Sequence, residues 1–377
     1  MPGRVCEDWT MAEMENGQLA DRVHGRMRVS LERGTFKDID ADKVIHGRFL
    51  TEKQGWMSKP VQEFLRVRIE SQRGVLDPFA GEGHLLQVCA KTFECVIAGY
   101  DIQPGIWDRN DSLVNIPNPT AALIVTNPPY LASHSAQRKG VRSSMDKYFA
   151  LSERADLYQI ALDRCMEASD VVVAIVPETI LLSEYPRTNM VLMSVIESEL
   201  FSDTDTPVSV VCFDKNWQGE TALYVQDELI GSANEILALR KFNPSANTKV
   251  KFNVGSGRFG LRAVDGTQPE DRIEFFPAEN FSYPREKVKV SSRLMTYFEI
   301  PSVDNMDVER VALEANVVLN RLRTESSDLI LAPFKGNAKS GRRRRRLDYE
   351  VARAILDAAI KNLGLAPATD TIWANHD

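Results

Sequence analysis

The sequence predicts an α/β protein with a doubly wound parallel sheet, followed by a second region of mixed helices and strands. Three observations carry this prediction. Short apolar runs rich in β-branched residues alternate with helical stretches between residues 75 and 213, a pattern typical of strands buried on both faces. Beyond residue 215 the helical periodicity lapses and glycines punctuate short segments. The charge also changes sign along the chain, so the two parts are expected to meet different partners.

The expected strands follow one another along the chain, with a helical stretch between neighbours. Continuous β-branched runs of this length are typical of a sheet covered by helices on both faces. Such a sheet holds ligands at the carboxyl ends of its strands. The predicted strands are 75–76, 95–100, 121–125 and 171–176, and the predicted helices are 85–91 and 156–168.

Segments after residue 195 predict a hairpin, a C-terminal helix and the limits of the domains. The apolar stretches 195–201 and 207–213 flank a polar segment and predict an antiparallel hairpin at one edge of the sheet. Residues 349–363 carry apolar side chains at helical spacing and predict an amphipathic helix. We therefore expect an N-terminal lead-in over 1–45, a sheet-containing domain over 46–216 and a C-terminal α+β region over 217–377.

Composition bounds the class of protein. With 43% hydrophobic and 26% charged residues, the chain is unlike a disordered protein, a collagen or a disulfide scaffold. The five cysteines are scattered, with no metal-binding spacing, so we expect reduced thiols and no metal. There is no signal-like apolar segment and no apolar run approaching 18 residues, which predicts a cytoplasmic protein without a membrane anchor.

The net charge of -7 hides two opposite parts. Residues 240–377 hold 23 Lys and Arg against 18 Asp and Glu, a net of +5, whereas residues 1–239 hold 23 against 35, a net of -12. The basic part suits a polyanion such as nucleic acid, and the acidic part suits a cationic ligand.

The first motif lies between a predicted strand and a predicted helix. Its residues are Asp77, Pro78, Phe79, Ala80, Gly81, Glu82 and Gly83. Glycines there let the backbone approach a nucleotide-like ligand closely. The dinucleotide fingerprint fits poorly, because Leu86 stands where its third glycine would be. A carboxylate at Asp77 would repel a pyrophosphate and attract an ammonium group, which favours S-adenosylmethionine over NAD or ATP.

Further acidic positions follow the next strand. Asp101 ends that strand, where a carboxylate can accept hydrogen bonds from both hydroxyls of a ribose while Ile102 packs on the adenine ring. Asp111, followed by Ser112, is placed to accept from an adenine amino group. A strand-end cap and a surface turn are the alternative interpretations of Asp101 and Asp111.

The sharpest signal is the tetrapeptide Asn127, Pro128, Pro129 and Tyr130 after a buried strand. Two consecutive prolines fix the backbone and end the hydrogen-bonded ladder. The Asn127 side-chain oxygen and the Pro128 carbonyl would then be two acceptors aimed at a planar amino group, with Tyr130 stacking beside it. An exocyclic amine is a poor nucleophile until such acceptors draw its hydrogens out of the plane, so its methylation depends on positioning.

Together these motifs resemble those of the S-adenosylmethionine-dependent DNA methyltransferases that modify exocyclic amino groups, specifically the adenine-N6 branch. The resemblance covers residues 44–216, and the order of cofactor loop, tetrapeptide and C-terminal variable region resembles the gamma arrangement. It implies a Rossmann-like methyltransferase sheet and a C-terminal DNA-recognition region. The segment 46–51 resembles the motif that precedes the cofactor loop, although Thr51 is followed by Glu52 instead of proline. The cofactor contacts implied are Phe49, Thr51, Asp77, Pro78, Phe79, Ala80, Gly81, Gly83, Asp101, Ile102, Asp111, Ser112 and Asn127.

The resemblance also implies double-stranded DNA as the substrate. The target base must leave the duplex to reach a buried methyl donor, and Tyr130 and Phe213 are the candidates to sandwich it, with a core position as the alternative for Phe213. The polar, basic segment 133–148 predicts a loop that closes over DNA. Basic residues elsewhere, above all the run 342–346, would contact phosphates. The predicted DNA-binding residues are Arg138, Lys139, Arg142, Lys147, Arg258, Arg342, Arg343, Arg344, Arg345 and Arg346.

The sequence thus predicts a site-specific adenine-N6 DNA methyltransferase of a restriction-modification or phage setting. A cognate restriction endonuclease is a candidate partner, and we expect a monomer. The same acceptor pair could serve an RNA adenine or a protein glutamine amide. Cytosine-N4 methylation ranks lower, because serine more often stands at the position of Asn127. A non-catalytic binding module is disfavoured by the two intact motifs.

Overall fold

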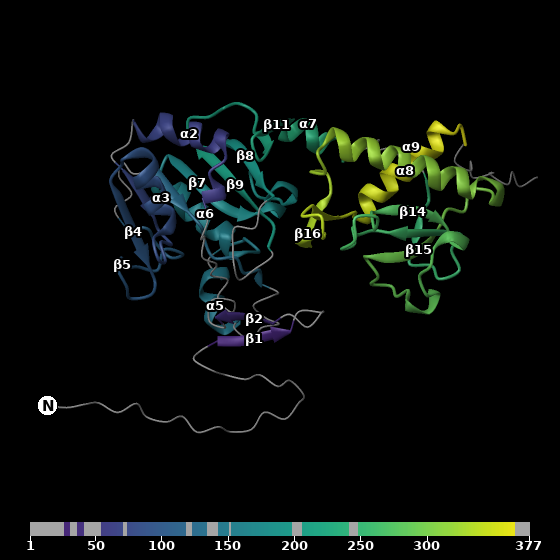
Figure 1. Ribbon diagram of the computed structural model, residues 1–377, viewed down its shortest axis with the longest axis horizontal. Helices are drawn as coiled ribbons and strands as arrows, with labels where there is room; N and C mark the ends of the chain where they lie inside the picture. Colours follow the sequence, from purple (N-terminus) through teal and green to yellow (C-terminus); the bar gives the residue numbers. More distant parts are fainter. Residues whose placement is uncertain are drawn as a thin grey trace, which may run out of the picture.

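The computed structural model consists of two parts that pack side by side (Figure 1). The larger part contains a nine-stranded sheet, and the smaller part contains a four-stranded sheet with two long helices, α8 and α9. Within the residues described, every helix is too short or too polar to cross a bilayer. The structure describes residues 54–70, 74–117, 123–133, 142–150, 152–197, 206–240 and 248–365, and the backbone of strands β1 (Arg26–Ser30) and β2 (Phe36–Asp40).

The large sheet has the strand order β11-β10-β8-β9-β7-β6-β3-β4-β5. Its strands are parallel except β9 and β11. The mixed α/β fold with a mostly parallel sheet is therefore confirmed. The strands are β3 (Val75–Asp77), β4 (Ile97–Asp101), β5 (Asp108–Arg109), β6 (Leu123–Thr126), β7 (Val171–Pro177), β8 (Met190–Ile196), β9 (Val208–Asp214), β10 (Ala222–Val225) and β11 (Glu228–Ser232).

Connecting helices cover the sheet on both faces. The chain leaves β3 through α3 (His84–Phe93) toward β4, and leaves β6 through α6 (Leu157–Ala168) toward β7. These two crossovers run in opposite directions along the sheet. Because crossovers between parallel strands are right-handed, α3 and α6 must lie on opposite faces. The helices predicted over 85–91 and 156–168 are thereby confirmed.

The predicted hairpin forms, but its first strand begins earlier than expected. Strands β8 and β9 pair antiparallel, with β8 at Met190–Ile196 instead of 195–201. The start of this strand was not predicted because the hydroxyl of Ser194 interrupts the run of apolar residues. In the fold Ser194 is fully buried, with its hydroxyl hydrogen-bonded to Ser58 at 2.8 Å and to the Gln226 carbonyl at 3.0 Å.

The hairpin also does not end the sheet. Strand β9 inserts between β7 and β8, and β10 pairs with the other side of β8. A second hairpin, formed by β10 and β11, stands at the edge. These strands lie beyond residue 216, where the domain boundary is predicted, yet they belong to the large sheet.

The smaller part follows as a separate antiparallel sheet. Its strand order is β12-β15-β13-β14, and α8 packs on β14 and on α9. The amphipathic helix predicted over 349–363 is confirmed as α9. The elements are β12 (Lys251–Phe252), β13 (Phe259–Arg262), β14 (Glu274–Pro277), β15 (Met295–Glu299), α8 (Val308–Glu325), β16 (Ala332–Asn337), β17 (Arg343–Arg346) and α9 (Tyr349–Asn362).

The remaining helical elements are short. The α-helices are α2 (Lys59–Ile69), α5 (Arg142–Phe149) and α7 (Ala233–Ala238), and the 3-10 helices are η1 (Gln54–Trp56), η2 (Glu178–Leu182), η3 (Ala278–Asn280), η4 (Arg285–Lys287) and η5 (Asn305–Asp307). Of these, η2 follows β7 directly and so stands at the carboxyl end of the sheet.

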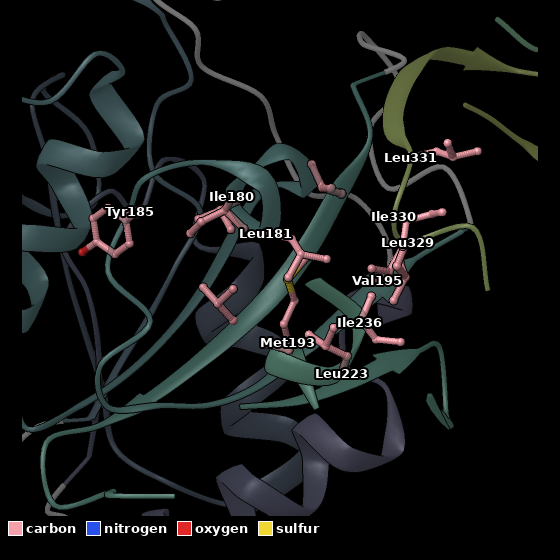
Figure 2. Packing of buried hydrophobic residues seen from close by; sticks show 14 of the residues in the cluster. Ile180, Leu181, Tyr185, Met193, Val195, Leu223, Ile236, Leu329, Ile330 and Leu331 are labelled. Atoms are coloured by element: carbon pink, nitrogen blue, oxygen red, sulfur yellow. The ribbon is translucent and has the colours of Figure 1, made fainter. Parts of the chain in front are cut away.

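One apolar core runs through both parts. The segment after α8, with Leu329, Ile330 and Leu331, packs toward Val195 of β8 and Ile236 of α7 (Figure 2). All five side chains are at most 3% exposed. The two parts are therefore joined by an apolar interface, which fixes their relative position.

The arginine run forms a strand in which every second side chain is buried, instead of a solvated DNA-binding stretch. Arg343 and Arg345 of β17 are 7% and 3% exposed, and both face Glu178 at the start of η2. Arg343 also donates to the Ile196 carbonyl at 2.6 Å. Arg344 donates to the Asp265 carbonyl at 2.8 Å. The prediction that Arg343 and Arg345 contact DNA is wrong for this structure, because their guanidinium groups are buried and hold the two parts together. Arg344 is half-buried, and its hydrogen bonds stay within the smaller part.

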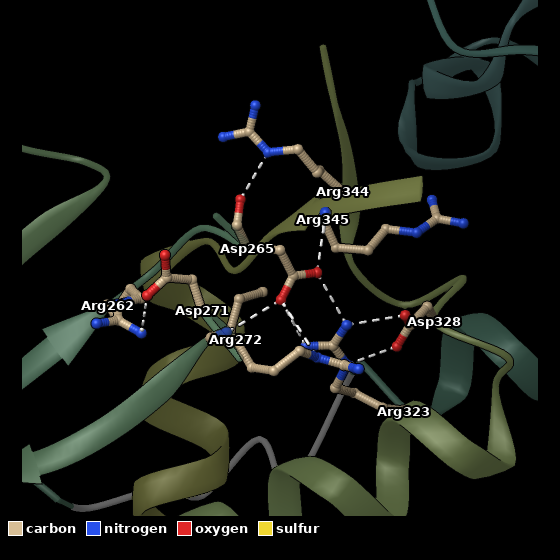
Figure 3. Close-up of polar contacts among 9 residues, drawn as sticks. Arg262, Asp265, Asp271, Arg272, Arg323, Asp328, Arg344 and Arg345 are labelled. Atoms are coloured by element: carbon tan, nitrogen blue, oxygen red, sulfur yellow. Dashed lines mark hydrogen bonds and ion pairs between the residues drawn. The ribbon is translucent and has the colours of Figure 1, made fainter. Parts of the chain in front are cut away.

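Asp265 is the centre of a second arginine cluster (Figure 3). This carboxylate is fully buried and accepts hydrogen bonds from both Nη atoms of Arg323, at 2.9 and 3.1 Å. Asp328 accepts two more from Arg323, and the Arg345 backbone N–H donates to Asp265 at 3.1 Å. Burial opposes ionisation of Asp265, but Arg323 outweighs it and holds the pKa of this carboxyl below its usual value.

Candidate active site

The candidate site forms where three neighbouring strands end. In the order β6-β3-β4, the last residues are Thr126, Asp77 and Asp101. The chain moves from β3 to β4 on one side and returns to β6 on the other. This reversal is the topological switch point at which open α/β sheets bind ligands.

A cavity of about 760 Å³ opens at this point. It brings together residues from both predicted motifs, since Gly81, Asp101 and Asn127 all contribute to its wall. The predicted residues that line it are Pro78, Phe79, Gly81, Asp101, Ile102, Asp111, Ser112, Asn127 and Pro129. Lining residues that the sequence analysis missed include Gln103, Ile106, Trp107, Asn110, Met145, Tyr148 and Leu157.

The glycine loop is held in place by the next strand. The Gly81 N–H donates to Asp101 Oδ2 at 2.9 Å, and the Ala80 N–H donates to the Tyr100 carbonyl at 2.9 Å. Gly83 caps α3 in a left-handed conformation, with φ of 80°, which favours glycine. Ala80 and Gly83 therefore shape the loop without lining the cavity.

Trp107 lies across this loop and was not predicted. Its Nε1 donates to the Gly81 carbonyl at 3.1 Å. A Cβ atom at Gly83 would lie 2.6 Å from the indole, and one at Gly99 of β4 would lie 2.8 Å from it. Both glycines thus make room for the ring. The only signal in the sequence is an aromatic residue shortly after Asp101, in a segment without regular periodicity.

Asp77 lies beneath the loop, not on the cavity wall. Its carboxyl group is 2% exposed and accepts hydrogen bonds from the Phe79 N–H at 2.9 Å and the Thr126 hydroxyl at 2.6 Å. Burial raises the pKa of Asp77 to about 7. This side chain joins the cofactor-type loop to the residue before Asn127, so direct contact with an ammonium group is not supported by its position.

Asp101 presents its carboxylate to the cavity. Oδ1 accepts from the Gln103 N–H at 2.7 Å, and Oδ2 accepts from the Gly81 N–H at 2.9 Å. Each carboxylate oxygen has two lone pairs, so both oxygens can still accept from a ligand. Ile102 stands beside it on the wall.

Asp111 faces helix α5 across the cavity. Its Oδ2 accepts from Lys147 Nζ at 2.8 Å and from the Tyr148 hydroxyl at 2.9 Å. Lys147 was predicted to bind DNA, but it lines the cavity and pairs with this carboxylate. The hydrogen bond to Asp111 raises the pKa of Lys147. The first described helix after the tetrapeptide therefore closes one side of the cavity.

The tetrapeptide begins on the cavity wall and then turns into the core. Asn127 and Pro129 line the cavity, whereas Tyr130 is 9% exposed. The Tyr130 hydroxyl contacts Asn127 Oδ1 and the Ile175 carbonyl of β7, the latter at 2.9 Å. Its ring stands edge-on to Tyr158. In this structure Tyr130 contacts the Asn127 amide, and its ring is buried where β7 and α6 meet, so it does not present an open face to a base.

Two further predicted residues serve the core or a local network. Phe213 is 1% exposed near the end of β9 and stands edge-on to Tyr185, so in this structure it occupies the core position given as its alternative. Arg258 donates to Glu299 at 3.0 Å and to carbonyls of Ile300 and Val303. These contacts hold the start of β13 to the end of β15 and leave little of this guanidinium for DNA.

Several predicted residues lie outside the described part of the chain. These are Phe49, Thr51, Arg138 and Lys139, as well as the side chain of Arg142. Arg342 and Arg346 are described and half-buried at the ends of the arginine strand.

The described residues suit a neutral or cationic nucleoside-like ligand. Three carboxylates, one of them paired with Lys147, an amide oxygen and aromatic or aliphatic surfaces surround one cavity. Among the residues described, no cluster of three or more His, Cys, Asp or Glu side chains could hold a metal ion.

Comparison with known proteins gives structural likenesses only. The sequence matches no protein-family model and no curated protein. A type I restriction-modification methyltransferase subunit from Streptococcus thermophilus aligns with a TM-score of 0.37 and 16% identity, over 47% of each chain. The type IIG restriction endonuclease BpuSI aligns at 0.34 and 16% identity, over 47% of this chain and 27% of its own. The type I restriction enzyme EcoKI M protein aligns at 0.30 and 12% identity, over 79% and 70%.

Proposed function

We propose that this protein transfers a methyl group from S-adenosylmethionine to the N6 amino group of an adenine in double-stranded DNA, in a restriction-modification or phage setting. One observation carries the proposal: Asp101, which ends β4, and Asn127, which follows β6, face the same cavity at the switch point, on either side of β3. A cognate nuclease is the corresponding partner. The part with the large sheet would form the catalytic domain, with β10 and β11 extending it beyond the predicted boundary at residue 216, and the smaller part would form the recognition region.

The cavity fits the adenosine part of the proposed cofactor. Asp101 retains acceptor capacity for ribose hydroxyls, and Ile102 offers an apolar surface to an adenine ring. The glycine loop allows close approach of a ligand to the backbone. When bound, S-adenosylmethionine would supply an electrophilic methyl group on a positively charged sulfur.

Asn127 would hold the acceptor amine. Its Oδ1 already accepts from the Tyr130 hydroxyl, which fixes the direction of the amide. A second lone pair on the same oxygen can accept one amino hydrogen of a base. Drawing the amino group toward this oxygen orients the nitrogen for attack, so the protein contributes positioning more than proton abstraction.

Labelled methyl transfer tests this proposal. The full chain is incubated with methyl-labelled S-adenosylmethionine and duplex DNA, RNA or protein, and the product nucleosides are separated. We expect label in N6-methyladenine from DNA. Label confined to RNA, to glutamine or to N4-methylcytosine would refute the adenine-N6 DNA assignment and identify the acceptor instead.

Asn127→Ala then tests the site. We expect transfer to fall by several orders of magnitude while cofactor binding persists, because Asn127 contributes positioning of the acceptor. Asn320→Ala, at an exposed position of α8, is the matched control and should keep full activity. Retained turnover in Asn127→Ala would remove this residue from the reaction.

A further inference from the structure

Arg343 and Arg345 are buried, so the smaller part would need other cations to contact DNA. The segment 282–294, here called the basic loop, connects η3 to β15. It carries Arg285, Lys287, Lys289 and Arg293 against a single acid, Glu286, a net of +3 in a chain of net -7. All four cationic residues are exposed.

Three cations of this loop have no acidic partner among the described residues. Some exposed cations elsewhere do pair with acids, as Arg310 does with Asp307 at 2.5 Å and Lys215 with Asp170 at 3.1 Å. Lys287, Lys289 and Arg293 make no ion pair or side-chain hydrogen bond within the described residues. Their charge is therefore available to an outside partner.

The backbone of the loop is firmly held. Asn253 Nδ2 donates to the Val290 carbonyl at 2.7 Å, and the Tyr349 hydroxyl donates to the Ser292 carbonyl at 2.5 Å. Arg285 stacks on Tyr297 and donates to the Gly257 carbonyl at 3.1 Å. A loop anchored at three points loses little further freedom when a partner binds, which favours affinity.

We propose that the basic loop contacts the phosphates of duplex DNA through Lys287, Lys289 and Arg293. The inference rests on the proposed function. Unpaired, exposed cations on a preorganised loop suit a polyanion. Phosphates fix the position of the duplex without reading its sequence, so the loop would orient the DNA while the bases are read elsewhere.

Salt-dependent binding tests the proposal without knowledge of the recognition sequence. The probe is a fluorescent duplex of about 30 base pairs and mixed sequence, titrated with full-length protein between about 50 and 200 mM salt. The test variant combines Lys287→Gln, Lys289→Gln and Arg293→Gln. We expect the slope of log affinity against log salt to become shallower by about one for each lost contact, hence by about three.

Two further variants control for charge and for folding. The triple variant Arg310→Gln, Arg321→Gln and Lys361→Gln removes the same charge from exposed positions of α8 and α9, and its slope should match the wild type. The charge-preserving variant Lys287→Arg, Lys289→Arg and Arg293→Lys should also keep the wild-type slope.

The outcomes separate this inference from the proposed function. If the wild type methylates duplex DNA but the loop variant keeps the full slope, the inference fails while the function stands. If the wild type neither binds nor methylates duplex DNA, both fail. Loss of binding to vesicles of anionic lipid in the loop variant, with an unchanged DNA slope, would assign the loop to a membrane surface and also overturn the proposal.

Discussion

Replacing Glu178 by Gln should strongly destabilise the protein, because this carboxylate holds two buried arginines. Glu178 stands at the start of η2 and is 3% exposed. It accepts a hydrogen bond from Arg345 Nη1 and lies 3.8 Å from Arg343 Nε. Both arginines are brought from β17, on the other side of the interface between the two parts. The substitution keeps the shape of the side chain, removes its charge and replaces one acceptor oxygen by an NH2 donor.

The expected loss of stability is about 3–5 kcal/mol, the usual effect of removing one partner from a buried ion pair. Coulomb's law agrees, since unit charges about 4 Å apart attract by ~4 kcal/mol at an effective dielectric constant of about 20. The free energy of unfolding is measured by urea denaturation, followed by both far-UV circular dichroism and tryptophan fluorescence. Coincident transitions would show that the two parts unfold together.

Lys215→Gln provides the matched comparison. Lys215 pairs with Asp170 on the same sheet, but these side chains are 39% and 68% exposed. Solvent screens such a pair, so this variant should lose less than about 1 kcal/mol. The double variant Glu178→Gln, Arg345→Gln should recover part of the loss, because one uncompensated charge is gone. A Glu178→Gln variant within about 1 kcal/mol of the wild type would refute the view that this pair joins the two parts.

Three other predictions follow from the candidate site. Trp107→Ala should weaken S-adenosylmethionine binding by on the order of tenfold, ~1.4 kcal/mol, because the Gly81 carbonyl of the glycine loop loses its hydrogen bond to the indole. Isothermal titration calorimetry measures this affinity. An unchanged affinity would remove Trp107 from the site. Phe213→Ala should lower the free energy of unfolding by about 3–5 kcal/mol without changing DNA affinity, and the reverse pattern would restore Phe213 as a stacking residue. Burial raises the pKa of Asp77 from 3.8 to about 7. Between these pH values the folded chain keeps a proton on Asp77 that the unfolded chain has lost. The free energy of unfolding should therefore fall as the pH rises from about 4 to about 7. Asp77→Asn should remove this fall, on the order of 4 kcal/mol, in urea titrations across that range; a pH dependence equal to that of the wild type would show that Asp77 is ionised in the fold.

The site could be placed from the sequence because its residues sit at the ends of local elements. Asp101 and Asn127 each follow a strand that its β-branched run predicts, and carboxyl ends of parallel strands meet at one edge of a sheet. Trp107 could not be found this way. Its importance depends on the space left by Gly83 and Gly99, which become its neighbours only after the sheet forms.

The sequence and the tertiary structure decided different features of this protein, and the burial of polar and aromatic side chains shows the difference. The sequence by itself determined the order of strands and helices and the positions of the motifs, because periodicity and turn residues act over a few neighbours. Only the tertiary structure decided that the arginine run is an interior strand, since its partner Glu178 lies 167 residues away from Arg345 in the chain. The same holds for Tyr130 and Phe213, whose aromatic rings could stack on a ligand or fill a core. Which of the two occurs depends on distant residues that pack around them, and local sequence carries no record of those contacts.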